Sequence, residues 1–78
     1  MIKKEMKLVI TFHTTTEAMT MEQECKAAGA DGRIIPVPRS ITAGCGLAWC
    51  ASPESRDALV ALMADKGIRY QAVHDCLV

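Results

Sequence analysis

Aromatic side chains, an excess of one charge and long apolar runs are all scarce or absent in this 78-residue sequence. Its only aromatic residues are Phe12, Trp49 and Tyr70, so a hydrophobic core has to be built from aliphatic, methionine and alanine side chains. Nine basic residues balance nine acidic ones, which argues against a nucleic-acid-binding protein that works through positive charge. No apolar stretch approaches the roughly 18 residues of a membrane span, so we expect no transmembrane helix and no membrane partner.

The length and composition predict one small folded domain over residues 1–78. Half of the residues are hydrophobic and 23% are charged, which excludes a disordered chain of low hydrophobicity. A chain of this size buries a thin core, so a homodimer is a reasonable arrangement. The segment from Met1 to Met6 lacks the apolar run and cleavage pattern of a signal peptide. We therefore expect a cytoplasmic protein, in a compartment where structural disulfides are rare.

Four cysteines in a chain this short require an explanation, and they are Cys25, Cys45, Cys50 and Cys76. An even number invites a disulfide framework, but the expected reducing compartment argues against one. The spacing contains no C-x-x-C pair and no close cysteine–histidine knuckle, so we predict no metal site and no cofactor. What remains is a mixture of buried apolar cysteines and at least one chemically active thiol.

The hydrophobic periodicity predicts four strands and two helices. Leu8, Ile10 and Phe12 alternate along a first strand. Thr14 and Glu17 have capping-box spacing at the start of a helix. The apolar stripe of that helix is Ala18, Met21, Cys25 and Ala28, and that of the second helix is Ala58, Leu59, Leu62 and Met63. The first half of the chain is predicted to form strand 7–13, helix 14–28, strand 32–37 and loop 38–46. Strand 47–51 and a helix with Ser52 as N-cap that ends at Gly67 follow. The last strand is predicted over 68–74, with an alternative end at Leu77.

The β-α-β-β-α-β order predicts an α+β, ferredoxin-like fold, in which two helices cover one face of an antiparallel sheet. The usual strand order in that fold is 4-1-3-2. Pro36 has no N–H to donate, which favours an edge position for the second strand. In this topology Cys50 and Cys76 lie on strands separated by the first strand, so a bond between them is not expected. Cys25 falls on the helical stripe and is assigned to the core, whereas Cys50 and Cys76 stay open between packing and a secondary thiol.

The same topology places the loop 38–46 at the end of the sheet where the first helix begins. Cys45 would then lie near His13, Thr14 and the free N–H groups of the helix start, and Arg39 would add a positive charge. Such surroundings stabilise a thiolate or a bound anion. His13 could also assist proton transfer at Cys45.

Simpler interpretations of these residues remain open. Gly44 and Gly46 could serve only a turn, with Cys45 incidental between them, and His13 could be a solvated strand-end side chain. The methionines at 19, 21 and 63 fall within the predicted helices, so they are expected to fill gaps in the core rather than to bind copper.

Three segments of the chain resemble a known family. They are the run from Thr11 to Met19, the run Gly32-Arg33-Ile34-Ile35-Pro36-Val37-Pro38-Arg39-Ser40-Ile41, and Cys45-Gly46-Leu47-Ala48. Together they resemble the selenium/sulfur carrier-like family of small bacterial proteins, earlier classed as a domain of unknown function. The resemblance implies that Cys45 is the thiol that carries a persulfide or perselenide, with Gly46 beside it, and it matches Arg39 and Ser40 to the family's loop. It assigns no role to Cys25, Cys50 or Cys76.

The resemblance implies a carrier that relays sulfur or selenium between a donor and an acceptor protein, rather than an enzyme. Two other functions remain open at this point. One is a regulatory module that binds a small anion without covalent chemistry, and the other is a soft-metal chaperone. The second lacks the pair of closely spaced loop cysteines that such chaperones use.

Overall fold

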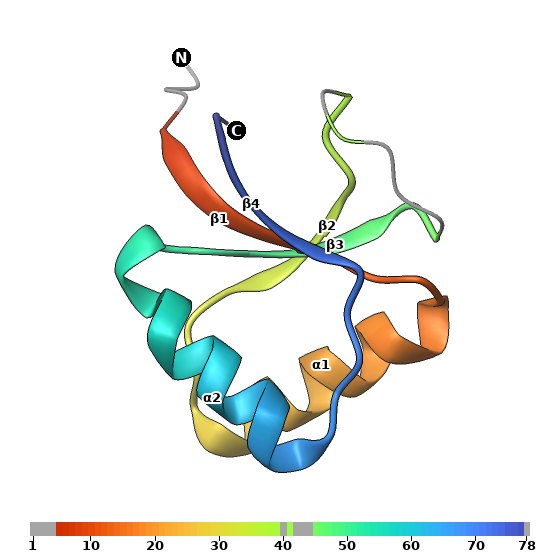
Figure 1. Cartoon of the computed structure of the whole chain (residues 1–78), viewed down its shortest axis with the longest axis vertical. Helices are drawn as coiled ribbons and strands as arrows, with labels where there is room; N and C mark the ends of the chain where they lie inside the picture. The colour runs from red at the N-terminus through yellow and green to blue at the C-terminus, as the bar shows by residue number, and fades with distance from the viewer. Residues whose placement is uncertain (1–4, 40, 42–44, 78) are drawn as a thin grey trace.

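A computed structural model describes residues 5–39, 41 and 45–77 of the chain, and it shows two helices packed under a four-stranded antiparallel sheet (Figure 1). The strands are β1 (Met6–Thr11), β2 (Arg33–Pro36), β3 (Leu47–Ala51) and β4 (Ala72–Leu77), and the helices are α1 (Thr15–Ala28), α2 (Arg56–Lys66) and a short 3-10 turn, η1 (Pro53–Ser55). The sheet order is β2-β3-β1-β4, with every neighbouring pair antiparallel. The predicted ferredoxin-like fold and its strand order are confirmed.

The core lies between the sheet and the helices. Leu8, Ile10 and Phe12 project from β1 and the residue after it, and all three are fully buried. Met21 and Cys25 of α1 pack against them. The strict alternation along β1 therefore directs one side of the strand to the helices, as predicted.

The opposite side of the sheet carries no helix (Figure 1), and we call it the open face. Cross-strand partners share a face, and Val9 pairs with Cys50 on one side and with His74 on the other. Thr11 lies on the same face and pairs with Ala48. The central residues of the open face are buried although no helix covers them.

Both ends of α1 follow from local chemistry. The Thr14 hydroxyl accepts a hydrogen bond from the Glu17 N–H at 3.1 Å, and the Glu17 carboxylate accepts one from the His13 N–H at 2.8 Å. At the other end Gly29 adopts the left-handed conformation, with φ of 67°. The predicted cap and stop are confirmed, but Ala28 is exposed and does not belong to the buried stripe.

The second helix begins later than predicted. Ser52 was expected to cap an α-helix, but its side chain makes no capping hydrogen bond, and residues 53–55 form the 3-10 turn. This turn is held from outside, since the Asp31 carboxylate accepts hydrogen bonds from the Ser52 N–H at 2.9 Å and the Ser55 hydroxyl at 3.0 Å. The buried stripe of α2 is Leu59 and Met63, and the predicted member Ala58 is exposed.

The last strand also begins later than predicted, at Ala72 rather than at Ile68. The Ile68 N–H bonds back to the Met63 carbonyl at 2.9 Å, so the residues after Gly67 complete the helix end. Ile68 is buried in the core instead of pairing in the sheet. The extension through Leu77 is confirmed.

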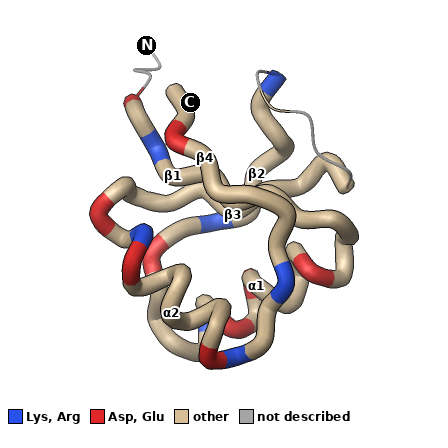
Figure 2. The backbone as a smooth tube through the Cα atoms, in the orientation of Figure 1, with Lys and Arg blue, Asp and Glu red and all other residues tan. Residues whose placement is uncertain are grey.

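Charges of both signs are interspersed along the described part of the chain (Figure 2), which agrees with the balanced composition. Within the described residues, no helix is both long and apolar enough to cross a membrane.

Candidate functional site

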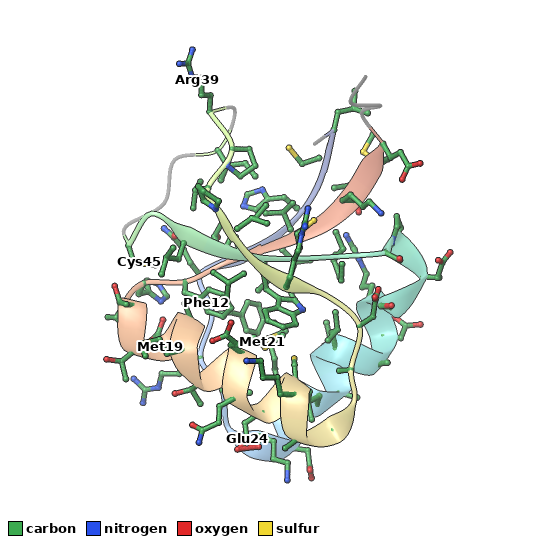
Figure 3. All side chains as sticks on the ribbon, turned by 180° about the vertical axis from the view of Figure 1, so that it is seen from behind. Phe12, Met19, Met21, Glu24, Arg39 and Cys45 are labelled. Atoms are coloured by element: carbon green, nitrogen blue, oxygen red, sulfur yellow. The ribbon has the colours of Figure 1, made fainter. Side chains whose placement is uncertain are left out.

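Cys45 lies two residues before β3, at the point where the chain returns to the sheet (Figure 3). It is half-buried and packs against the hydrophobic core. Its Sγ is 3.5 Å from the carbonyl oxygen of Leu47, to which the thiol can donate a weak hydrogen bond. One side of the side chain is therefore held by the protein, while the other remains accessible.

Gly46, the residue after Cys45, is exposed. Its φ of 78° lies in the left-handed region that glycine adopts without strain, and a Cβ built there would meet no atom within 4 Å. The Gly46 carbonyl accepts a hydrogen bond from the Val37 N–H at 3.0 Å. This bond ties the residue before β3 to the residue after β2. The position beside the thiol is thus firmly placed but sterically open.

The start of α1 lies at the same end of the sheet as Cys45. Thr11 and Ala48 form the last pair of the β1–β3 ladder, so the residues after Thr11 leave the sheet beside those that lead into β3. Figure 3 shows Cys45 over the connection between β1 and α1. The first-turn N–H groups of Thr15 and Thr16 have no partner within the helix, as in any α-helix. Cys45 therefore lies at the end of the sheet where α1 begins, while residues 40 and 42–44 of the predicted loop lie outside the described residues.

Two titratable side chains, those of His13 and Glu17, lie at the start of α1. His13 has an exposed side chain whose Nδ1 lies 3.5 Å from the Glu17 carboxylate. Thr14 uses its hydroxyl to cap the helix. His13 and Thr14 therefore serve first to hold the helix start, and the proton-transfer role of His13 stays a prediction.

Among the described residues of the predicted site, the Arg39 side chain points away from Cys45 (Figure 3). It lies in a turn closed by a 3.0 Å hydrogen bond from the Ile41 N–H to the Pro38 carbonyl, and its exposed side chain extends outward from the tip of the loop (Figure 3). Ser40 and Gly44, the other predicted loop residues, lie outside the described residues.

The remaining cysteines differ in their burial: Cys25 and Cys50 are buried and Cys76 is partly exposed. Cys25 is buried within α1, and burial, with a smaller contribution from Glu24, raises the pKa of its thiol to about 11. Its assignment to the core is confirmed. Cys50 and Cys76 lie on β3 and β4 with β1 between them, as predicted. In the described part of the chain, no group of three or more His, Cys, Asp or Glu side chains is arranged to hold a metal ion.

A comparison with protein families matches residues 7–75 to the family described as "Putative Se/S carrier protein-like". The chain belongs to this family. The match covers both helices and nearly the whole sheet, and it confirms the resemblance drawn from the three sequence segments. Searches of the curated proteins and of the solved structures found no match.

Membership in a selenium/sulfur carrier-like family directs attention to the thiols, because a thiolate is the group that accepts a terminal sulfur or selenium atom. Of the four, Cys45 alone combines partial exposure with a loop position and a neighbouring helix start. A carrier also implies donor and acceptor proteins.

Proposed function

We propose that this protein carries sulfur or selenium as a persulfide or perselenide on Cys45 and transfers it between partner proteins. The observation that carries the proposal is the setting of Cys45, which is half-buried against the core, next to an open glycine and at the end of the sheet where α1 starts. The family assignment supports the same chemistry.

Loading would proceed by exchange at sulfur. The Cys45 thiolate attacks the terminal sulfur of a donor's persulfide, a new S–S bond forms, the donor's S–S bond breaks, and the donor's cysteine leaves as a thiolate. The product is a persulfide anion on Cys45. Unloading repeats the exchange with an acceptor nucleophile, and the Cys45 thiolate is the leaving group. No net oxidation occurs, so neither step needs a cofactor.

The chain supplies three things to this exchange. The core and the Leu47 carbonyl limit the movement of the Cys45 side chain. The first-turn N–H groups of α1 favour an anion at their end of the helix. The open position at Gly46 leaves room for a partner's active site to reach the carried atom.

Arg39 takes a different part in the proposal from the one expected in the sequence. Because its side chain extends outward from the loop tip, it is placed to contact a partner protein rather than the carried atom. Ser40 and Gly44 stay in the proposal as loop residues from the sequence pattern alone, since they lie outside the described residues. The partners supply the catalytic groups, so the protein acts as a carrier rather than as an enzyme.

The proposal is tested by loading the purified protein with a cysteine desulfurase or a selenocysteine lyase and locating the added atom by mass spectrometry of intact protein and peptides. We expect one added sulfur or selenium atom on Cys45, its loss in C45S, and its retention in C76S, the matched control on a half-exposed cysteine of β4. Loading that persists in C45S, or that never reaches Cys45, would overturn the proposal.

A further inference from the structure

A hollow opens at the far end of β3 from Cys45, where β3 leads into the 3-10 turn. Its volume is about 270 Å³, which is room for several water molecules. It is lined by Lys7, Asp31, Gly32, Arg33, Cys50, Ala51 and Ser52. None of these residues belongs to the site around Cys45.

The sheet register places two cations and a thiol together here. Arg33 is the direct cross-strand partner of Cys50. Cys50 also pairs with Val9 of β1, and Lys7, two residues earlier on β1, shares the open face with both. Three strands thus each contribute one side chain to the same hollow.

Some polar groups of the hollow have hydrogen-bond or ion-pair partners among the described residues and others have none. Cys50 is only 8% exposed, yet its thiol has no hydrogen-bond partner among the described residues. The Arg33 guanidinium has neither a hydrogen bond nor an ion pair within the same part of the chain. Lys7 is 3.4 Å from the Glu5 carboxylate, and the Asp31 carboxylate already accepts hydrogen bonds from Ser52 and Ser55. Arg33 is therefore the charged group of the hollow without a partner among the described residues, whereas the negative charge of Asp31 is offset in part by Lys7.

We propose that this hollow is a second site, which binds a small inorganic oxyanion between Arg33 and Lys7 and against the Cys50 thiol. A guanidinium forms paired hydrogen bonds to such oxyanions, and an ammonium adds a compact charge. The site is independent of the function proposed for Cys45, since the two cysteines lie toward opposite ends of β3 and share no lining residue.

The experiment uses Cys50 as a reporter in the full chain. Native protein is treated with iodoacetate, which is anionic, or with iodoacetamide, which is neutral, and labelling of each cysteine is read from peptide masses. Cationic surroundings should raise the iodoacetate-to-iodoacetamide ratio at Cys50. We expect R33Q to lower that ratio about fivefold, as removal of a neighbouring charge does in a partly screened site. Inorganic sulfate or phosphate, compared with chloride at equal ionic strength, should slow labelling of Cys50 in wild type but not in R33Q.

R69Q is the matched control, because Arg69 is also exposed but lies between α2 and β4, away from the hollow. It should leave the ratio and the oxyanion protection unchanged. K7Q provides a second variant at the site and should lower the ratio as well. An unchanged ratio in R33Q and K7Q, no protection by either oxyanion, or a Cys50 that reacts only after unfolding would each overturn the proposal. Repeating the labelling in C45S separates this result from the carrier function.

Discussion

Gly32 shows how one residue position can depend on the absence of a side chain. Its φ is 120°, and a Cβ built there would overlap the Trp49 indole nitrogen and the Cys50 carbonyl. That nitrogen donates a hydrogen bond to the Asp31 carbonyl at 3.1 Å, while the Asp31 side chain binds the turn that follows β3. A short segment before β2 thus joins the core tryptophan to the start of η1.

Substitution G32A is expected to destabilise the protein by about 2–4 kcal/mol, through steric overlap together with a strained backbone. G67A is the matched comparison, because Gly67 also has a positive φ, of 66°, but its Cβ would meet open space. That variant should cost only about 1–2 kcal/mol. Urea denaturation of both variants measures the difference, and equal losses would contradict the overlap at Trp49.

The Asp31 carboxylate gives the stability a dependence on acid pH. The hydrogen bond from the Ser52 N–H, followed by that from the Ser55 hydroxyl, lowers the pKa of Asp31 below its ordinary value of 3.8. A depressed folded-state pKa adds stability above that ordinary value, and the contribution is lost as the pH falls through the folded-state value.

The variant D31N should therefore be less stable than wild type at neutral pH by about 0.5–1 kcal/mol, a modest figure because the carboxylate is exposed and screened by solvent. The difference should shrink as the pH is lowered from about 7 to about 3. Urea denaturation at several pH values measures it. A difference that stays constant over this range would show that the charge of Asp31 has no part in holding the turn.

At the scale of elements, the sequence predicted those whose ends are determined locally. The bounds of β3 match the prediction, and α1 begins after the predicted cap at Thr14 and ends at Gly29. The starts of α2 and β4 could not be predicted in the same way, because they depend on contacts between distant segments. Asp31, more than twenty residues away, engages the turn before α2, and the Gln71 N–H donates to the Thr11 carbonyl just before β4 begins.

The same distinction applies to the candidate sites. The position of Cys45 at the end of the sheet where α1 begins followed from strand order alone. The outward direction of Arg39 depends on the turn closed between Pro38 and Ile41, which no spacing in the sequence specifies. The grouping of Arg33 with Cys50 depends on the pairing register of β2 with β3, which the sequence does not specify. The alternation of side chains along each strand indicates only which residues of one strand share a face.

The cap at Thr14 should contribute measurably to α1 and to the end of the sheet where Cys45 lies. T14A removes the acceptor of the Glu17 N–H and is expected to cost about 1 kcal/mol. T15A, one residue into the helix, removes an exposed side chain of similar size and should change stability little or improve it. Thermal or urea unfolding distinguishes the two, and an equal loss in both variants would contradict the capping role of Thr14.

At the scale of the whole molecule, the four thiols occupy four different settings. Cys25 is enclosed between α1 and the sheet, Cys45 lies at the end of the sheet where α1 begins, and Cys50 lines the hollow near the other end of β3. Cys76 is half-buried near the end of β4. This small fold, with helices on one side of the sheet only (Figure 1), therefore buries Cys25 and Cys50 and leaves Cys45 and Cys76 partly exposed.

Native-state alkylation should reveal this arrangement. We expect Cys25 to be labelled only upon global unfolding, because it is 1% exposed and its raised pKa disfavours the thiolate. Cys45, which is half-exposed, should be labelled in the folded protein. Peptide mass spectrometry over a range of urea concentrations measures both, and labelling of Cys25 below the unfolding transition would contradict the packing of α1.

The most direct test of the carrier function is the position of the carried atom after transfer from a donor persulfide. Peptide mass spectrometry of the loaded wild-type protein should find one added sulfur or selenium atom on Cys45, removable by reductant and absent from C45S. The same protein should lose that atom when an acceptor thiol is supplied. Loading of folded C45S to the wild-type level, or an added atom found only on another cysteine, would contradict the account.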